Sequence, residues 1–533
     1  MEAKYLKVLV AERIADKGVE KLREAGLDVD FNPTIKRDEL LKIIGEYDAL
    51  IVRSVTKVNE ELYAKATNLK VVGRAGNGVD NIEMDGASKR GIIVVNTPDA
   101  NTTTTAEHTI ALLLASNRRI PQADAMIRRH EWDRTKFKGS ELYGKTLGII
   151  GLGRIGSKVA VRMKGFGMKI IAYDPYIADE RFERFGVEKK ETLEDLMKEV
   201  DFLTIHTPKT PETLGMVEKN ILNLAKDGLR VVNCARGGLY NEEDLYEAIQ
   251  SGKVASAAID VLKDEPNLTS PLLQSDKVVF TPHLGADTFE AQDNVGICVA
   301  EEVINVLSGN IVPNAVNLPT VGPDEMEGLF DYLKLGERLG NLYYGIWKDP
   351  VESIQVTFGG EAVNFNTKTI TLAVLKGLFE PVMTGRVNYV NAGVIAEEEG
   401  IAMATVLKQD DKRFKNLLKV KIKGQKGEHT FAGMVAGHDE IRINRVDNFF
   451  FDIKPTQNMI FIVNEDKPGR IGQVGAIIGD MGINIGAMQC APDDKGNAMI
   501  ILSVDRELSE AELSKFMEIP GILKAKFVKI YNS

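Results

Sequence analysis

The segment TLGIIGLGRIG, residues 146–156, constrains the fold of this chain more than any other stretch. A short apolar run leads into Gly151-Leu152-Gly153-Arg154-Ile155-Gly156, the glycine spacing of a strand–turn–helix unit that binds a dinucleotide pyrophosphate. The start of the helix offers free N–H groups and a favourable dipole to the phosphates. Such a turn follows the first strand of its domain, yet almost 150 residues precede it here. The nucleotide domain must therefore begin well inside the chain.

The next apolar segment, MKIIAYD, ends in an acidic residue that selects between dinucleotides. Asp174 stands close to the position, about 20 residues beyond the turn, where a carboxylate accepts hydrogen bonds from the ribose hydroxyls and repels a 2′-phosphate. Neither Pro175 nor Tyr176 supplies a cation that would attract such a phosphate. The pattern predicts NAD as the cofactor. A tight strand–helix turn without a ligand is the alternative.

Short apolar runs alternate with amphipathic segments both before and after the glycine turn, which is typical of doubly wound α/β units. A helix predicted after residue 287 would cross back to the first unit and leave a cleft between the two. The fold class is α/β, with a Rossmann-type nucleotide lobe inserted into a flavodoxin-like substrate lobe. We predict four domains: a split substrate-binding domain (1–98 and 287–316), an NAD-binding domain (99–286), an intervening α+β domain (317–455) and a C-terminal domain, the tail (456–533).

The intervening domain shows no recognisable order of helices and strands, whereas the tail does. The intervening domain mixes a helical stretch with strands, including one over 440–454, and contains no catalytic constellation. The tail has the order strand, helix, strand, strand, helix, strand, which is the ferredoxin-like unit. A tail that serves only for dimerisation is an alternative to one that binds a ligand.

Composition excludes several classes of protein. The net charge is −10 and the pI is about 5.4, so nucleic acid and anionic membrane surfaces would repel the chain. No apolar run approaches the ~20 residues of a membrane span, and the first residues show no secretion signal. Three scattered cysteines fit neither a disulfide framework nor a zinc site. We expect a reduced, cytoplasmic protein without a metal.

Oxidation of an alcohol requires a base, a group that tunes its pKa and a cation for the substrate. His283, just past a predicted strand, is the best placed histidine, and Glu265 could pair with it and raise its pKa. Arg236 follows a buried strand, where either a bound anion or a salt bridge would explain it. Of the other histidines, His108 is interpreted as a packed structural residue, and His206 lies within the nucleotide run.

Taken together, the glycine turn, Asp174 and the segments NCARGG, AAIDVLKDEP and TPHLGA resemble the D-isomer-specific 2-hydroxyacid dehydrogenases. The resemblance implies that Arg236, Glu265 and His283 are catalytic. It also implies contacts to NAD from five residues of the turn and from Asp174; the five are Gly151, Gly153, Arg154, Ile155 and Gly156. Around the nicotinamide it implies contacts from Thr207, Pro208, Cys234, Asp260, Gly285 and Ala286.

Within that family, VRSVTKV, GRAGNGVDNIE and HEWDRTKFKG are similar to the members that act on 3-phospho-D-glycerate. The resemblance implies oxidation of that compound to 3-phosphohydroxypyruvate, the first step of L-serine biosynthesis. Substrate contacts are then expected from Arg53 and Arg74 (phosphate), main-chain N–H groups of Asn77 and Gly78 (carboxylate), and Arg134 and Lys136 of a neighbouring subunit. This implies a homo-oligomer, a dimer or a tetramer. Asn77 departs from the family's frequent Thr, which leaves only its backbone role.

The tail resembles the ACT domain, an amino-acid-sensing module. Pro468 and Gly469 predict a tight turn into a helix whose N-terminus offers N–H groups to a carboxylate. Asn464, Asp466 and Asn484 could meet across an interface between two tails. The resemblance implies that such a pocket binds L-serine and slows the enzyme.

Two other functions are compatible with the same nucleotide unit. One is a glyoxylate or hydroxypyruvate reductase of the same family, which the paired arginines and the tail disfavour. The other is an NAD-sensing corepressor-like binding protein, which the acidic composition and the tail disfavour.

Overall fold

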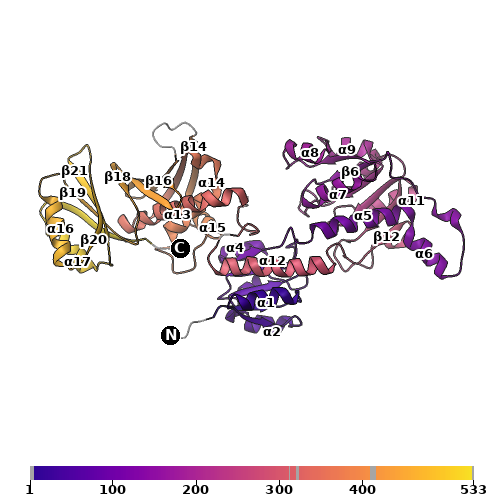
Figure 1. Cartoon of the computed structure of the whole chain (residues 1–533), viewed down its shortest axis with the longest axis horizontal. Coiled ribbons are helices and arrows are strands. Elements are labelled where there is room, and N and C mark those ends of the chain that lie inside the picture. The colour runs from indigo at the N-terminus through magenta and orange to yellow at the C-terminus, as the bar shows by residue number, and fades with distance from the viewer. Residues whose placement is uncertain (1–4, 311, 320–322, 409–415, 531–533) are drawn as a thin grey trace.

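The computed structural model describes residues 5–310, 312–319, 323–408 and 416–530. Figure 1 shows the nucleotide lobe at one end of the molecule and the tail at the other, with the substrate lobe and the intervening domain between them. Each of these four parts contains one β-sheet. The predicted α/β fold class, with an inserted Rossmann-type lobe, is confirmed, whereas the predicted domain boundaries stay a prediction.

The substrate lobe contains a parallel five-stranded sheet in the order β2-β1-β3-β4-β5. Its helix α12 (Phe289–Leu307) follows the nucleotide lobe in the chain and packs on this sheet. The approach to α1 is close, because a Cβ on Gly18 would lie 2.4 Å from the Gly296 carbonyl oxygen. The other elements are β1 Lys7–Val10, α1 Asp16–Glu24, β2 Asp28–Phe31, α2 Arg37–Ile43, β3 Ala49–Val52, α3 Glu60–Tyr63, β4 Val71–Arg74, α4 Met84–Lys89 and β5 Ile93–Val95.

The nucleotide lobe contains a parallel seven-stranded sheet in the order β12-β11-β10-β9-β6-β7-β8. Helices cover both of its faces, and their apolar side chains form two cores. The elements are α5 Thr102–Arg118, α6 Ile120–Arg128, β6 Thr146–Ile150, α7 Arg154–Lys164, β7 Lys169–Tyr173, α8 Asp179–Phe185, β8 Glu188–Lys189, α9 Leu193–Glu199, β9 Phe202–Ile205, α10 Lys219–Leu224, β10 Leu229–Asn233, α11 Glu242–Ser251, β11 Val254–Ile259 and β12 Val278–Phe280.

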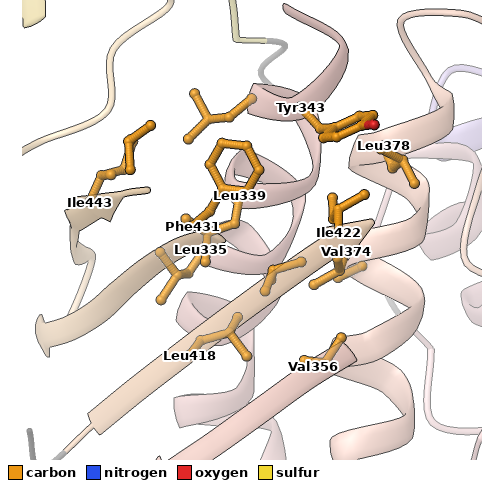
Figure 2. Close-up of a cluster of buried hydrophobic side chains, with 14 of the residues drawn as sticks. Leu335, Leu339, Tyr343, Val356, Val374, Leu378, Leu418, Ile422, Phe431 and Ile443 are labelled. Atoms are coloured by element: carbon orange, nitrogen blue, oxygen red, sulfur yellow. The ribbon is translucent and has the colours of Figure 1, made fainter. Parts of the chain in front are cut away.

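The intervening domain packs helices α13 and α14 against a six-stranded sheet in the order β14-β13-β15-β16-β17-β18. Figure 2 shows Leu335, Leu339 and Tyr343 of α13 directed toward apolar side chains of α14 and the strands. The elements are α13 Pro323–Ile346, β13 Val351–Gly360, α14 Thr367–Phe379, α15 Ala392–Glu398, β14 Ala402–Lys408, β15 Asn416–Gly424, β16 Gly427–Gly437, β17 Glu440–Val446 and β18 Phe449–Ile453.

One secondary-structure prediction in this domain was wrong. The single strand expected over 440–454 is a hairpin of β17 and β18, because the chain reverses at Asp447, which has φ of +50°. Aspartate tolerates this left-handed conformation better than most residues.

The tail contains an antiparallel four-stranded sheet in the order β20-β21-β19-β22, the ferredoxin-like arrangement predicted from its elements. Helices α16 and α17 cover one face. The other face packs on the intervening domain, with Phe461, Ile501 and Val528 in the same apolar core as α13. The elements are β19 Asn458–Glu465, α16 Arg470–Asp480, β20 Ile485–Pro492, β21 Asn497–Val504, α17 Glu510–Met517 and β22 Ile522–Lys529.

Within the described ranges, no helix is both long enough and apolar enough to span a bilayer.

Candidate active site

The three glycines of the turn after β6 meet three different steric demands. Gly151 has φ of +89°, and Gly156 lies so close to it that a Cβ would be 2.1 Å from the Gly151 carbonyl oxygen. A Cβ on Gly153 would instead meet nothing within 4 Å. The outer two glycines therefore bring helix α7 against the strand, and Gly153 presents bare backbone beside the start of the helix. This arrangement fits a pyrophosphate.

Asp174 follows β7 and is fixed beside the same turn. Its Oδ2 accepts a hydrogen bond from the Leu152 N–H at 2.9 Å, and its Oδ1 accepts one from the Tyr176 N–H at 3.1 Å. Arg154, the first residue of α7, forms an ion pair with Asp99, Nε to Oδ1 2.8 Å. The carboxylate of Asp174 is therefore held where the ribose of a dinucleotide would lie.

The remaining candidate cofactor residues follow consecutive strands of the sheet. Thr207 and Pro208 come after β9, Cys234 directly after β10, Asp260 directly after β11, and Gly285 and Ala286 in the loop after β12. The carboxyl ends of these parallel strands meet at one edge, where ligands bind in open α/β sheets. Cys234 is buried, and burial raises the pKa of its thiol, so it lies at this edge as a neutral side chain.

His283 and Glu265 form the pair that the sequence predicted. The His283 Nδ1 lies 2.7 Å from Glu265 Oε2, and Glu265 Oε1 accepts a hydrogen bond from the Leu262 N–H at 2.8 Å. The hydrogen bond to Glu265 raises the pKa of His283, although burial opposes this shift. His283 has φ of +58°, a strained conformation for a residue other than glycine, and such strain clusters at functional sites.

Asp260 holds the loop that carries His283. Its buried carboxylate accepts hydrogen bonds from the N–H groups of Leu284 (2.8 Å) and Gly285 (2.9 Å). The Asp260 Oδ1 also lies 3.2 Å from the Nε2 of His108 on α5 and 2.5 Å from the Thr281 hydroxyl. Burial alone would raise the pKa of Asp260, but these hydrogen bonds outweigh it and lower the pKa. From the sequence, Asp260 was expected only to contact the cofactor, and His108 was interpreted as a packed structural residue. The contact between His108 and Asp260 was missed because nothing in either local segment indicates it.

Arg236 bridges the two lobes. Its Nε lies 3.3 Å from Asp80 Oδ2 on the substrate lobe, and its Nη1 donates to the Ala235 carbonyl at 2.7 Å. A Cβ on Gly78 would be 2.0 Å from the Arg236 Nη2, so the guanidinium lies directly against this glycine. Of the two explanations that the sequence left open for Arg236, an ion pair with Asp80 is present. Asp80, three residues after Asn77, was not among the predicted residues.

Arg74, the last residue of β4, is largely buried. Its Nε has no hydrogen-bond partner, and its Nη1 donates to the Ala75 carbonyl at 3.3 Å. Burial, together with the nearby guanidinium groups of Arg236 and Arg53, lowers the pKa of Arg74 to about 10. Three guanidinium groups thus gather at one place, and an unpartnered buried N–H is costly without an anion.

The loop with Arg53 follows β3 and is held from two sides. Asn81 Nδ2 donates to the Arg53 carbonyl at 3.0 Å, and Glu12 accepts from the Thr56 N–H at 2.8 Å. Asn77 lies beside this site, where its carbonyl accepts a hydrogen bond from the Asn96 side chain at 2.6 Å. Sequence reasoning missed Asn81 and Glu12, which contact backbone rather than ligand.

Arg134 and Lys136 are placed differently. Both lie exposed in a 3₁₀ turn, η2 (Arg134–Phe137), and Lys136 pairs with Asp133 at 3.5 Å. Among the residues that the structure describes, neither makes a hydrogen bond to another candidate substrate residue. Trp132 beside them is 85% exposed. Within one chain, therefore, the Arg134 and Lys136 side chains lie on the surface and do not bind the other described candidate substrate residues.

Of the candidate effector residues, Asn464 and Asp466 precede α16, and Asn484 lies between α16 and β20. Asn464 is buried, its Nδ2 donates to the Glu465 carbonyl at 2.7 Å, and its Oδ1 has no partner. Asp466 and Asn484 are exposed, and the Asn484 N–H donates to Asp505 Oδ1 at 3.1 Å. Within one chain, these three residues form no closed pocket of mutual hydrogen bonds in the part that the structure describes.

Three family models match successive parts of the chain. The D-isomer specific 2-hydroxyacid dehydrogenase NAD binding domain matches residues 110–285. The D-3-phosphoglycerate dehydrogenase intervening domain matches residues 328–447, and the ACT domain matches residues 458–521.

Solved structures and full-length relatives agree with these matches. A glyoxylate reductase from Paecilomyes thermophila (TM-score 0.55, 28% identity) covers 59% of this chain and 99% of its own. An NAD-bound 3-phosphoglycerate dehydrogenase from Entamoeba histolytica (TM-score 0.50, 28% identity) covers 58% of this chain and 98% of its own. D-3-phosphoglycerate dehydrogenases from Archaeoglobus fulgidus (98% of this chain, 100% of the relative) and Bacillus subtilis (98% and 99%) are 42% and 40% identical to it. The chain therefore belongs to the D-3-phosphoglycerate dehydrogenase family.

Proposed function

We propose that this chain oxidises 3-phospho-D-glycerate to 3-phosphohydroxypyruvate with NAD as the acceptor. The observation that carries the proposal is that Arg53 and Arg74, at the carboxyl ends of substrate-lobe strands β3 and β4, lie near Arg236, which reaches the substrate lobe from the nucleotide lobe. A phosphate dianion would compensate the mutual repulsion of the guanidinium groups, and the forked donors of arginine suit it.

His283 is the proposed base. A carboxylate only accepts hydrogen bonds, so Glu265 selects the tautomer in which Nδ1 carries the proton. The Nε2 of the neutral ring is then left to take the proton of the substrate hydroxyl, and Glu265 stabilises the imidazolium that forms. Arg236 is proposed to orient the substrate carboxylate and to stabilise the developing carbonyl.

The cofactor supplies the hydride acceptor when it is bound. The residues present fit this role, since Gly153 leaves the backbone open to the pyrophosphate and Asp174 stands beside the turn. The buried hydrogen bonds of Asp260 keep the loop with His283 and Gly285 in place at the same strand edge. The remaining nicotinamide contacts are proposals from the family resemblance.

The alternative functions receive less support. A glyoxylate reductase shares the two-lobed fold, so the fold does not decide the substrate. The buried arginine and the two further domains are what favour a phosphorylated substrate and a regulated enzyme. A corepressor-like protein would have no need for a tuned His–Glu pair.

We also propose a cytoplasmic homo-oligomer that L-serine inhibits through the tail. The buried, unpartnered Oδ1 of Asn464 and the exposed Asp466 support a pocket that a second tail completes. Exposed apolar side chains on the nucleotide lobe, among them Ile127, Trp132 and Tyr143, support a second contact between subunits. The neighbour's Arg134 would then reach the substrate.

The direct test is formation of NADH from NAD and 3-phospho-D-glycerate, followed by absorbance. We expect turnover with this substrate and much weaker turnover with D-lactate or glycolate. Equal rates on the unphosphorylated acids would contradict the proposal.

A further inference from the structure

The loop between α14 and α15, residues 386–391, joins the intervening domain to the substrate lobe. Arg386 Nη1 donates to the Leu69 carbonyl at 2.9 Å, and its Nη2 donates to the Asn68 carbonyl at 3.5 Å. Asn388 Nδ2 donates to the Gly91 carbonyl at 2.7 Å. Side chains of one domain thus satisfy backbone carbonyls of the other. We call residues 386–391 the docking loop.

The docking loop is held rigid by its own asparagines. Asn388 Oδ1 accepts hydrogen bonds from the N–H groups of Val390 (3.0 Å) and Asn391 (3.3 Å). Asn391 Oδ1 accepts from the Asn388 N–H at 2.8 Å, and its Nδ2 donates to the Arg386 carbonyl at 2.7 Å. A loop so constrained transmits a displacement instead of absorbing it.

The docking loop contacts the substrate lobe at the amino ends of two strands. Asn68 and Leu69 lie just before β4, and Gly91 lies just before β5. The other end of β4 is Arg74, the buried arginine of the phosphate site. Because a strand rises about 3.3 Å per residue, the docked carbonyls and Arg74 are separated by a single short, stiff element.

The opposite side of the docking loop is anchored to the longest helix of the intervening domain. The Tyr389 hydroxyl donates to Glu337 of α13, and Lys376 of α14 pairs with the same carboxylate at 2.8 Å. The Lys376 ammonium also lies 5.1 Å from the centre of the Tyr389 ring. Lys376 and Glu337 are both buried, so a shift of α13 must move Tyr389 or break a buried ion pair, which is costly.

The far end of α13 carries the tail. A Cβ on Gly345 would lie 2.8 Å from Val528 of β22, which shows how closely the two pack. Directly after the helix, the Trp347 ring lies 4.7 Å from the Lys524 ammonium and stacks on His429 at 4.0 Å. A single helix therefore contacts the tail at its C-terminal end, at Gly345, and the docking loop eight residues earlier, at Glu337.

We propose that the docking loop is the coupling element through which the state of the tail reaches the phosphate-binding arginines. The order of contacts is tail, α13, Glu337, Tyr389, Arg386, the start of β4, and Arg74. The inference rests on the proposed regulation by L-serine. Arg386 and Tyr389 are positioning residues in it, since neither lies at the strand edge where substrate and cofactor bind. Coupling of this kind requires a ligand that stabilises one arrangement over the other.

The test compares the full-length wild type with Arg386→Ala and with Arg442→Ala as a matched control. Arg442 is an arginine of the same domain that pairs with Glu440 on its surface. We expect Arg386→Ala to keep its kcat within about twofold and to bind L-serine in calorimetry. Its inhibition by L-serine should weaken by a factor of about 5 to 150, the usual range of allosteric coupling. Arg442→Ala should behave as the wild type.

The same coupling is tested by a second variant, Tyr389→Phe, and by hydrogen exchange, which does not depend on turnover. Tyr389→Phe removes one hydroxyl, retains the ring beside Lys376, and should weaken inhibition in the same direction but less. Hydrogen exchange of residues 71–74 should respond to L-serine in the wild type and not in Arg386→Ala, a comparison that needs no turnover. Unchanged inhibition and unchanged exchange response in Arg386→Ala would overturn the inference while the proposed catalytic function stands. Loss of turnover in the wild type would instead count against the proposed function.

Discussion

The same four residues, Gly-Arg-Ile-Gly, begin a helix in two distant parts of this chain, at 153–156 and at 469–472. In both places the helix starts at the arginine, α7 at Arg154 and α16 at Arg470. Both helix starts follow a strand by a short turn. One belongs to the nucleotide lobe and the other to the tail, and their surroundings differ at each position.

In the nucleotide lobe, the last glycine of the tetrapeptide is buried against the backbone of Gly151, and Arg154 extends outward to Asp99. In the tail, a Cβ on Gly472 would meet nothing within 4 Å. Arg470 instead folds beneath the turn of Gly521, with its Nε buried and unpartnered. The four residues are identical, but only the nucleotide-lobe site has a glycine two residues earlier, Gly151, against which the helix packs.

The comparison teaches that a motif acts through what surrounds it. In the nucleotide-lobe turn, the close approach of Gly156 to the Gly151 carbonyl oxygen fixes the helix on its strand. The turn in the tail leaves one face of its helix open and a polar atom of Asn464 without a partner. Under the proposed function, L-serine and a second tail would complete this site.

The largest expected effect is the loss of turnover when the proposed base of the nucleotide lobe is removed. His283→Ala should lower kcat by about 10²–10⁴, the usual contribution of a positioned acid–base group. Binding of L-serine to the tail should stay as in the wild type, which calorimetry on the same preparation measures. A variant with near-normal kcat would remove His283 from the chemistry.

The reciprocal change lies in the tail. Asp466→Ala should weaken L-serine binding by about tenfold or more, because a hydrogen bond to a charged group contributes about 1.5–3 kcal/mol. Its kcat without L-serine should remain that of the wild type. If the wild type itself binds no L-serine, the tail serves assembly alone and the expected pocket is wrong.

The glycines allow a direct test of packing. Gly156→Ala places a methyl group against a backbone oxygen and should destabilise the nucleotide lobe by about 1–3 kcal/mol or more, with weaker binding of NAD. Thermal unfolding with and without NAD measures both effects. Unaltered stability would mean that helix α7 can move away from its strand at little cost.

The pH dependence should report the Glu265–His283 pair. The folded enzyme raises the pKa of His283 above 6.5, so the base is protonated and inactive below that raised value, and kcat/KM rises with pH through it. Glu265→Gln removes the negative charge that favours the imidazolium. The acidic limb of the profile should therefore move to lower pH. An unmoved limb would separate Glu265 from the titrating base.

The smallest effect is expected at the matching glycine of the tail. Gly472→Ala adds a methyl group to an open helix face and should stabilise α16 by about 0.5–1 kcal/mol. Thermal unfolding of the full chain measures this gain. A loss of stability that depends on protein concentration would show that a second copy covers this face.

Much of the catalytic region was predictable because its signals are local. The glycine turn and Asp174 lie on consecutive elements, and Glu265 and His283 follow neighbouring parallel strands, so their meeting follows from strand order. The fold class followed from alternating strands and helices in the same way.

Contacts between distant elements were not predictable. His108 reaches Asp260 across 152 residues, and Arg386 reaches Leu69 across 317. In each case a polar side chain meets a group that looks ordinary in its own segment. The hairpin at Asp447 was missed for a related reason, since the left-handed residue that reverses the chain lies within a run typical of one strand.

The central claim, that the gathered arginines select a phosphorylated substrate, is tested most directly by one ratio. We would measure kcat/KM for 3-phospho-D-glycerate and for D-glycerate, with NAD, in the wild type and in Arg74→Ala. The wild type should strongly favour the phosphorylated acid, and Arg74→Ala should lose most of that preference by a rise in KM for 3-phospho-D-glycerate. The same preference in both proteins, or none in the wild type, would contradict the claim.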